Sequence, residues 1–228
     1  LSQAFDLYWL YTGDERFLQE RAYVYLSETA ECVLAWLDAG EDGLLRLPVS
    51  SSPEIYDNRP KAWLTPNSNY DLALMRWLFE RLSDMAARLG RTEEAERWGG
   101  ILRRLPDLSV NSENVLMLSP DDTLRESHRH HAHLMAVYPL RLLKAERSER
   151  ERQIIEASIA DLEKYGRGLW VGYSYAWAAA IYACAGNGDA ALYHLRQMWD
   201  HMCSPNGFHL NGDFRNVGMS FFHYRPFT

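Results

Sequence analysis

An all-α fold is predicted by two features of the sequence. Apolar residues recur at steps of three and four positions through most of the chain, which is the spacing of a helix that buries one face. Strict alternation of apolar and polar residues is absent over any useful length, and residues 115–118 form the single run that fits a strand. We therefore expect helices joined by loops.

The first predicted helical hairpin is marked by a glycine followed by a capping aspartate. Residues 1–11 are apolar and aromatic and are expected to end a helix at Gly13, with Asp14 as the cap of the next helix. That second helix is predicted over residues 15–39 and is closed by Gly40.

A glycine stop followed at once by a new cap returns at residues 89–92 and 185–189. The clearest helix of the chain ends at the junction of residues 89–92. Residues 92–105 are expected to form the second, more polar helix of the same hairpin. Three hairpins of one style indicate a structural repeat. The clearest helix has one apolar stripe, made by Leu72, Met75, Leu78, Phe79, Leu82, Met85, Ala86 and Leu89.

Three more helices are predicted in the second half of the chain. Ser148 and Glu151 form a capping box that opens a helix reaching about Lys164. Residues 173–185 are apolar nearly all round, so this helix is expected inside the protein. Residues 189–201 are expected to form a helix that packs behind it.

Length and composition exclude several classes of protein. With 228 residues, 47% of them hydrophobic, the chain is long enough for one compact domain, and residues 1–228 are expected to form it. A net charge of −7 argues against a nucleic-acid or membrane-surface partner, because both need a basic face. No apolar run reaches the length of a bilayer span, and no glycine-rich loop indicates a nucleotide or other organic cofactor. Cys32 and Cys184 lie in apolar helical patterns and are expected to be buried.

Four of the eight histidines fall within six residues, at His128, His130, His131 and His133, with Arg129 among them. One interpretation is a metal site, since imidazoles are common transition-metal ligands. A second is recognition of a polar ligand, with Arg129 and His130 as hydrogen-bond donors. The third is a set of satisfied polar groups that ties a loop to a short buried helix.

Against the metal interpretation, a zinc hydrolase pattern of the type His-x-His-x-Asp-His needs aspartate where this chain has Ala132. The pattern His-Glu-x-x-His is also absent from the sequence. We therefore expect no metal, and a metal-dependent hydrolase that uses the segment from His128 to His133 stays as an alternative.

Residues 128–139 resemble the His-Arg-His-x-Ser-His-Leu-x-x-Leu-Tyr-Pro signature of glycoside hydrolase family 95, with Ala132 in place of the serine. That family contains inverting α-L-fucosidases and their relatives. The resemblance implies an (α/α)6 barrel, of which this chain would supply well over half. It also implies an oligosaccharide or glycan substrate, contacted by His128, Arg129 and His130.

The loop between residues 47 and 58 resembles the family's Pro-Ser-x-Ser-Pro-Glu-Asn loop, whose glutamate is the general acid. The resemblance places that role on Glu54. Without it, a single loop glutamate would be interpreted as a solvated charge. Just after this loop, Asn67 is a candidate for substrate binding, Ser68 or Asn69 is a candidate helix cap, and Asp71 is a candidate supporting acid.

Residues 208–214 resemble the family's Phe-Gln-Ile-Asp-Gly-Asn-Phe, in which the aspartate is the general base. Here the two polar residues are exchanged, since Asn211 stands where the aspartate is expected and Asp213 where the asparagine is. The base is then either Asp213, which we favour, or missing. If it is missing, a non-catalytic carbohydrate-binding helical domain becomes the alternative, and Asn211 would contact substrate in either case.

A further match begins at Gly168 and resembles the family's Gly-Trp-Ser-x-x-Trp at the start of an inner helix. Trp170 and Tyr173 are candidates to stack on a sugar ring, although aromatic residues at helical spacing are more often core. Arg225 is a further candidate for a sugar or carboxylate contact.

The implied reaction is single-displacement hydrolysis of a terminal α-L-fucoside, with 1,2-linked fucose as the first choice and an α-L-galactoside as the alternative. Glu54 would protonate the leaving oxygen while Asp213 activates a water on the opposite face, which requires carboxyl groups about 6.5–9.5 Å apart. The chain begins at Leu1 without methionine or signal peptide, so we expect a piece of a longer protein. By resemblance, that parent is secreted or periplasmic and holds further water-activating asparagines before Leu1. The sequence carries no signal for an oligomeric state.

Overall fold

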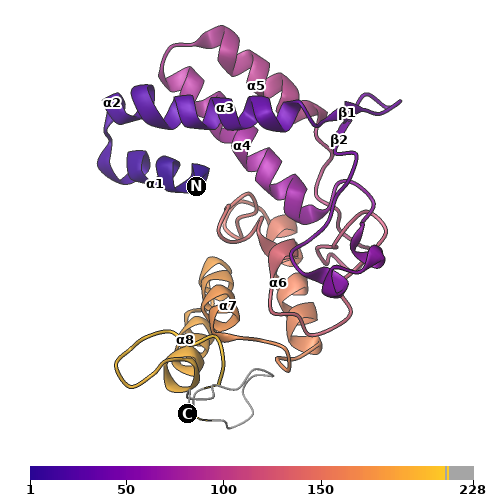
Figure 1. Ribbon diagram of the computed structural model, residues 1–228, viewed down its shortest axis with the longest axis vertical. Coiled ribbons are helices and arrows are strands. Elements are labelled where there is room, and N and C mark those ends of the chain that lie inside the picture. The colour runs from indigo at the N-terminus through magenta and orange to yellow at the C-terminus, as the bar shows by residue number, and fades with distance from the viewer. Residues whose placement is uncertain (214, 216–228) are drawn as a thin grey trace.

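A computed structural model of the protein describes residues 1–213 and 215, and the regular secondary structure of these residues is almost wholly helical. The helices follow one another around an arc, with α1 to α5 in one half and α6 to α8 in the other (Figure 1). The all-α prediction is confirmed. The principal helices are α1 (Ser2–Thr12), α3 (Tyr23–Leu34), α4 (Asn69–Arg88), α5 (Thr92–Arg104), α6 (Glu149–Lys164), α7 (Gly172–Cys184) and α8 (Gly188–Met202).

The junction of the first two helices has the predicted caps. Gly13 adopts a left-handed conformation, with φ of 66°, and its backbone N–H donates to the carbonyl of Trp9 over 2.8 Å. The side chain of Asp14 then accepts from the N–H of Phe17 and opens the short helix α2 (Glu15–Phe17). Glycine suits the stop because it has no Cβ to clash at positive φ.

The second helix is shorter than predicted. It continues from α2 through a π-helical turn, η1 (Leu18–Ala22), into α3, but it ends at Leu34 instead of residue 39. Strand β1 (Asp38–Ala39) occupies the last predicted positions and pairs antiparallel with β2 (Leu45–Arg46). The reason is local, since Asp42 accepts two hydrogen bonds from Arg46 and stabilises the tight connection.

Residues 115–118 do not form the predicted strand. Leu116 makes one isolated antiparallel bridge with Val110. In addition, its backbone N–H donates to the hydroxyl of Ser158 on α6 over 2.9 Å. The apolar run is buried against a helix, and burial of this kind produces the same short apolar pattern as a strand.

The hairpin of α4 and α5 has the predicted bounds to within one residue. Ser68 caps α4 by accepting from the N–H of Asp71 over 3.1 Å, so Ser68 and not Asn69 is the cap. The apolar stripe of α4 is buried from Leu72 to Ala86, as predicted, and its last member, Leu89, is half-buried at the end of the helix. On α5, Trp98 is buried and donates from Nε1 to the hydroxyl of Tyr23 over 3.0 Å, which ties α5 to α3.

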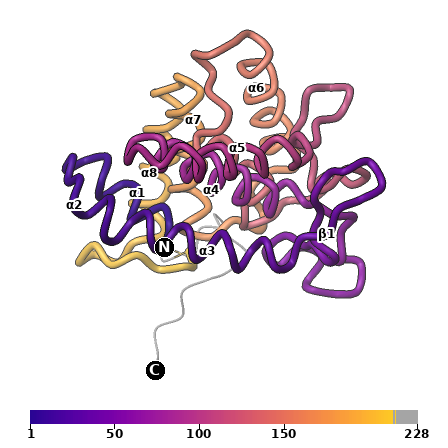
Figure 2. The backbone as a smooth tube through the Cα atoms, turned by 90° about the horizontal axis from the view of Figure 1, so that it is seen from above, coloured from indigo at the N-terminus to yellow at the C-terminus, as the bar shows by residue number. Residues whose placement is uncertain are grey.

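A buried ion pair joins α1 to α4. Asp6 is 4% exposed, and its Oδ1 accepts from Nε and Nη2 of Arg81 over 3.0 and 2.9 Å. Burial raises the pKa of Asp6, and the hydrogen bond and charge of Arg81 lower it in part. Seen from above, α3 and α6 lie on opposite sides of α4 and α5 (Figure 2).

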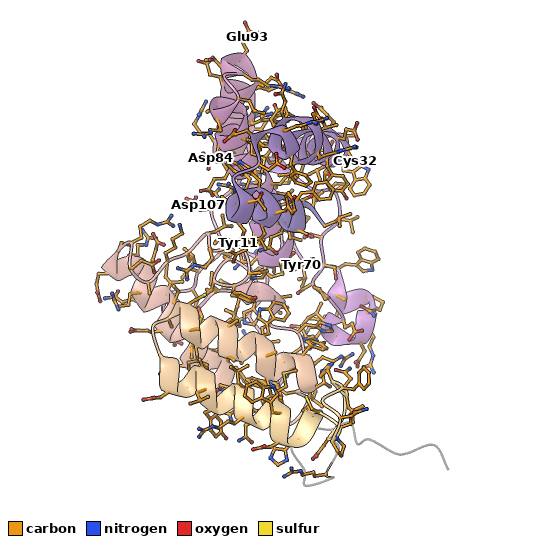
Figure 3. All side chains as sticks on the ribbon, turned by 90° about the vertical axis from the view of Figure 1, so that its left-hand side faces the viewer. Tyr11, Cys32, Tyr70, Asp84, Glu93 and Asp107 are labelled. Carbon is orange, nitrogen blue, oxygen red and sulfur yellow. The ribbon has the colours of Figure 1, made fainter. Side chains whose placement is uncertain are left out.

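The three helices of the second half lie where the sequence predicts them, to within one residue. Ser148 accepts from the N–H of Glu151 over 3.2 Å and opens α6. Helices α7 and α8 pack side by side as a hairpin (Figure 3). On α7, the side chains of Tyr175, Ala178, Ala179 and Ile181 are buried, whereas the other apolar side chains are half-buried or exposed. The prediction that this helix lies inside the protein therefore holds for one face only.

The segment that follows the histidines joins two hydrophobic cores. Ala136 and Leu140 belong to the core of α3, α4 and α5, whereas Leu134 and Val137 belong to the core of α6 and α7. The segment begins with one turn of 3-10 helix, η4 (Ala132–Leu134), which is the short buried helix expected there. Any displacement of this segment therefore disturbs both halves of the arc.

Two further sequence expectations can be compared with the fold. Cys32 is exposed on the surface of α3 and Cys184 is half-buried, so the prediction that both are buried was wrong (Figure 3). Both lie on helices whose other faces make the core. Among residues 1–213 and 215, no helix combines the length and the apolar character that a membrane crossing requires.

Candidate active site

The loop that carries Glu54 is anchored to the start of α4 by serine hydroxyls. Ser50 donates to Oδ2 of Asp71 over 2.6 Å and accepts from the N–H of Ser68 over 2.7 Å. Ser68 in turn donates to the carbonyl of Ser51 over 2.7 Å. The loop is therefore attached to a rigid helix by side chains that are themselves mostly buried.

Asp71 is the acceptor at the centre of this anchor. Burial raises its pKa, and the hydroxyls of Ser50 and Ser68 and a backbone N–H oppose the rise. Its carboxyl group is thus used to hold the loop, which is the supporting role expected for an acid in the first turn of this helix.

The backbone around Glu54 takes an uncommon conformation. Glu54, Tyr56, Asp57 and Asn58 all have φ between 51° and 56°, in the left-handed region that disfavours residues with a Cβ. Each such residue costs about 1–3 kcal/mol unless its surroundings hold it. One restraint is visible, since the hydroxyl of Tyr56 donates to Asp122 over 2.7 Å.

Glu54 meets the histidine segment, 74 residues further along the chain. Its Oε2 forms an ion pair with Arg129 and lies 3.6 Å from Nδ1 of His130. Its backbone carbonyl lies 3.2 Å from Nε2 of His128. The side chain of Glu54 is 45% exposed, so it is held from one side and open to a ligand from the other.

His128 is positioned to donate to the Glu54 carbonyl. Nδ1 of His128 lies 3.1 Å from the backbone N–H and 3.2 Å from the carbonyl of His130, and two of the three contacts of this ring, with that N–H and with the carbonyl of Glu54, suit a proton on Nε2. That proton faces the carbonyl of Glu54. His128 is buried, and its role here is to hold the backbone of the catalytic candidate.

His131 and His133 lie deeper than the other two. Both are fully buried, and burial lowers the pKa of His131 to about 3 and that of His133 to about 4. Nε2 of His131 lies 3.1 Å from the carbonyl of Ser174, and its ring packs against Trp170 with centroids 4.7 Å apart. These two imidazoles are neutral at physiological pH and belong to the framework behind the site.

The four imidazoles have different neighbours, which bears on the metal alternative. No three His, Cys, Asp or Glu side chains of residues 1–213 and 215 come close enough together to hold a metal ion. A metal-dependent hydrolase therefore has no ligand set in this part of the chain.

Ser174 is a residue that the sequence analysis did not identify. Its hydroxyl donates to the carbonyl of Arg129 over 2.7 Å and accepts from the N–H of Val171 over 3.1 Å. It thus ties the first turn of α7 to the histidine segment. A serine in the first turn of a predicted helix is the available signal, but nothing local indicates which distant carbonyl it will bind.

Trp170 and Asn67 lie inside the protein. Trp170 has no exposed surface and packs against His131, Tyr175 and His194. Asn67 is 2% exposed, and its amide accepts from the N–H of Leu47 and donates to the carbonyl of Leu45. Trp170 is therefore core and Asn67 braces the loop, so the sugar contacts expected of them are not part of our proposal.

Tyr173, in contrast, reaches the site. Its hydroxyl lies 2.8 Å from Nε2 of His130, with the two rings tilted at a centroid distance of 5.4 Å. Burial is the main cause that raises the pKa of Tyr173 to about 12. Its side chain is half-buried.

The second catalytic candidate is more enclosed than the first. Asp213 is fully buried, and its Oδ1 accepts from the N–H of Arg215 over 3.1 Å. It lies near Tyr175, whose pKa is raised to about 12 mainly by burial and partly by the charge of Asp213. Asn211 is exposed. Arg225 lies outside the described residues.

Comparison with known proteins gives two matches. The model described as "Glycosyl hydrolase family 95 catalytic domain" matches residues 1–218. The chain is also similar to "Alpha-L-fucosidase 2" from Arabidopsis thaliana, with 25% identity over 201 residues that cover 85% of this chain and 23% of that protein. The chain thus spans about a quarter of the length of the curated relative it matches.

Proposed function

The chain belongs to glycoside hydrolase family 95, and on this premise we propose that it forms part of the active site of an inverting hydrolase of terminal α-L-fucosides. The observation that carries the proposal is the environment of Glu54. A half-exposed carboxyl group is held on one oxygen by Arg129 and faced by His130, from a segment far away in the sequence. Such a convergence suits a group that must act on a bound ligand.

In the proposed reaction, Glu54 gives a proton to the glycosidic oxygen as its bond to the sugar breaks. A water activated by Asp213 attacks the sugar carbon from the opposite face, which inverts its configuration. Arg129 and His130 also lie where they can donate to sugar hydroxyls, since both are partly exposed beside Glu54.

Asp213 sets a condition on this mechanism. Because its carboxyl group is fully buried, the attacking water must occupy a position inside the protein, between Asp213 and the sugar. We therefore expect substrate binding to make Asp213 accessible to one water.

The substrate proposed first is a 1,2-linked α-L-fucosyl oligosaccharide. The name of the Arabidopsis thaliana relative supports fucose as the sugar, and an α-L-galactoside is the alternative within the same reaction class. The linkage comes from the family resemblance of the loop and histidine motifs.

Hydrolysis by the protein that contains this chain tests the proposal. The product anomer is followed by NMR in the unmodified protein and in Glu54→Gln and Asp213→Asn, with Glu113→Gln in an exposed loop as the matched control. We expect β-fucose as the first product. We also expect a loss of about a hundredfold or more in kcat for both site variants, which is the usual contribution of an acid or base.

A second candidate function is favoured by the positions of Asn211 and Asp213. Exposure of the amide and burial of the carboxyl group would suit a carbohydrate-binding domain without a base. Binding of the fucosyl oligosaccharide with no turnover of fucosides or galactosides would support this function and reject the hydrolase.

A further inference from the structure

Three side chains form a line that ends at the proposed acid. The hydroxyl of Tyr173 lies 2.8 Å from Nε2 of His130, and the other ring nitrogen of His130, Nδ1, lies 3.6 Å from Oε2 of Glu54. This Nδ1 is buried and has no hydrogen-bond partner. The site therefore contains a polar atom aimed at Glu54 that is close to hydrogen-bond distance and not yet bonded.

His130 is neutral in these surroundings. Burial lowers the pKa of His130 most, the neighbouring His128 and Arg129 lower it further, and only the charge of Glu54 raises it. A neutral imidazole has one N–H and one lone pair, so the two nitrogens take opposite roles. Which nitrogen carries the proton is decided by the partner on each side.

Tyr173 and Glu54 favour the same arrangement. The raised pKa of Tyr173 keeps its phenol protonated at neutral pH, so its O–H can donate to Nε2 of His130. The proton of His130 then lies on Nδ1, where it faces an acceptor oxygen of Glu54. In the opposite arrangement, a lone pair on Nδ1 would face the lone pairs of a carboxylate, which is unfavourable.

Arg129 and His130 act on the same oxygen of Glu54. The ion pair with Arg129 and the approach of His130 both involve Oε2. Two donors on Oε2 favour negative charge on that oxygen and leave the proton of the acid to Oε1. The pair of donors thus distinguishes between the two carboxyl oxygens of Glu54.

We propose that Tyr173 is a positioning residue, which holds His130 in the tautomer with its proton on Nδ1. Arg129 and His130 then both bind Oε2 of Glu54, and Oε1 delivers the proton to the substrate. The inference rests on the proposed role of Glu54 as the acid. During the reaction the Oε1–H bond breaks, the proton bonds to the glycosidic oxygen, and the electron pair of the carbon–oxygen bond leaves with that oxygen. Negative charge that develops on Glu54 is stabilised at Oε2 as the contact from Nδ1 shortens.

The role of Tyr173 is tested by how strongly the hydrolysis rate depends on the leaving group of the substrate. An oligosaccharide needs a proton on its departing oxygen, whereas α-L-fucosyl fluoride departs with little help from an acid. For Tyr173→Phe in the protein that contains this chain, we expect kcat/KM to fall about tenfold or more on the oligosaccharide and about twofold or less on the fluoride. Tyr182→Phe is the matched control, because it also removes a phenol hydrogen bond from α7, but at Glu163.

Two substitutions of His130 distinguish the roles of its two ring nitrogens. The amide nitrogen of His130→Asn replaces Nδ1, and that of His130→Gln replaces Nε2. We expect His130→Asn to retain more activity on the oligosaccharide than His130→Gln. In the His130→Asn background, Tyr173→Phe should have little further effect, because its target is gone. Additive losses in the double variant would overturn the proposal.

The tautomer itself can be measured without turnover. Nitrogen chemical shifts of His130 in labelled protein should report a proton on Nδ1 in the unmodified chain and a mixture in Tyr173→Phe. A proton on Nε2 in the unmodified chain rejects the inference, and so do equal losses on both substrates. The proposed function fails separately, if Glu54→Gln retains full activity on the oligosaccharide or if the unmodified protein hydrolyses neither substrate.

Discussion

Ser50 donates its hydroxyl to Asp71 over 2.6 Å, and through this bond the first turn of α4 holds the loop that presents Glu54. Asp71 also accepts from Ser68, the cap of the same helix. One carboxyl group therefore links a helix terminus to the loop that carries the catalytic candidate. The position of the proposed acid thus depends on a residue that does not itself face the ligand.

Loss of this carboxyl group should loosen the loop. We expect Asp71→Ala to destabilise the protein by about 1–3 kcal/mol, because the buried hydroxyl of Ser50 loses its acceptor, whereas that of Ser68 keeps the carbonyl of Ser51. Hydrolysis of the oligosaccharide should fall as well, since Glu54 is no longer held. Urea unfolding and kcat/KM measure the two effects, and Asp107→Ala, at a side chain 98% exposed, is the control. Ser50→Ala should add little to Asp71→Ala, and full additivity would contradict a shared contact.

The buried histidines should make the protein sensitive to acid. The pKa of His131 is about 3 in the folded chain, compared with an ordinary value of 6.5. Below pH 6.5 the unfolded chain therefore binds a proton on this residue that the folded chain does not bind. Folding stability from this residue is complete above pH 6.5. It is lost at about 1.4 kcal/mol per pH unit as the pH falls toward the folded value.

Urea unfolding at several pH values between 7 and 4 measures this slope. In His131→Gln the amide nitrogen keeps the donor to the carbonyl of Ser174 but takes up no proton. In this variant we expect the slope of the unfolding free energy against pH to fall by about 1.4 kcal/mol per pH unit, which corresponds to one proton. An unchanged slope would show that other groups account for the acid sensitivity.

The ion pair between Asp6 and Arg81 should be essential to the packing of α1. Arg81→Met leaves the carboxyl group of Asp6 buried without its partner, and we expect a loss of about 3–5 kcal/mol. Asp6→Leu combined with Arg81→Met should be much less harmful, because no buried charge remains. Chemical unfolding of the two single variants and the double variant measures the coupling. A double variant as unstable as the sum of the single variants would rule out coupling through charge.

Gly172 is needed because another segment approaches it closely. A Cβ at this position would collide with the ring of His209 and lie 2.7 Å from the carbonyl oxygen of Leu210. Gly172→Ala should therefore displace the segment that leads to Asp213 and lower kcat. The helix itself should tolerate the change, since alanine favours a helix over glycine by about 1 kcal/mol.

Gly168→Ala is the matched control, because no atom lies within 4 Å of its Cβ position. Thermal unfolding and hydrolysis of both variants separate stability from activity. If Gly172→Ala retains full activity, the position of residues 209–213 does not limit the reaction.

Helix positions were predicted well because their signals are local. The caps at Asp14, Ser68 and Ser148 and the stop at Gly13 act within one turn of helix. The apolar stripe of α4 likewise follows from the repeat of a single helix. The prediction failed at β1, because helical periodicity carries no signal for the short hairpin in which Asp38 and Ala39 pair with Arg46 and Leu45.

In the candidate site, too, some features were predicted from the sequence and others were not. The sequence by itself marked the histidine segment as a candidate site, and the resemblance of its motifs to a known family added Glu54 and Tyr173. Only the tertiary structure decided that Glu54 meets Arg129 and His130, that Trp170 is core and that Asn67 braces a loop. The contacts of Glu54 with Arg129 and His130, 75 and 76 positions further along the chain, depend on how whole helices pack. That packing is set by the shapes and buried surfaces of many side chains together, which no short stretch of sequence contains.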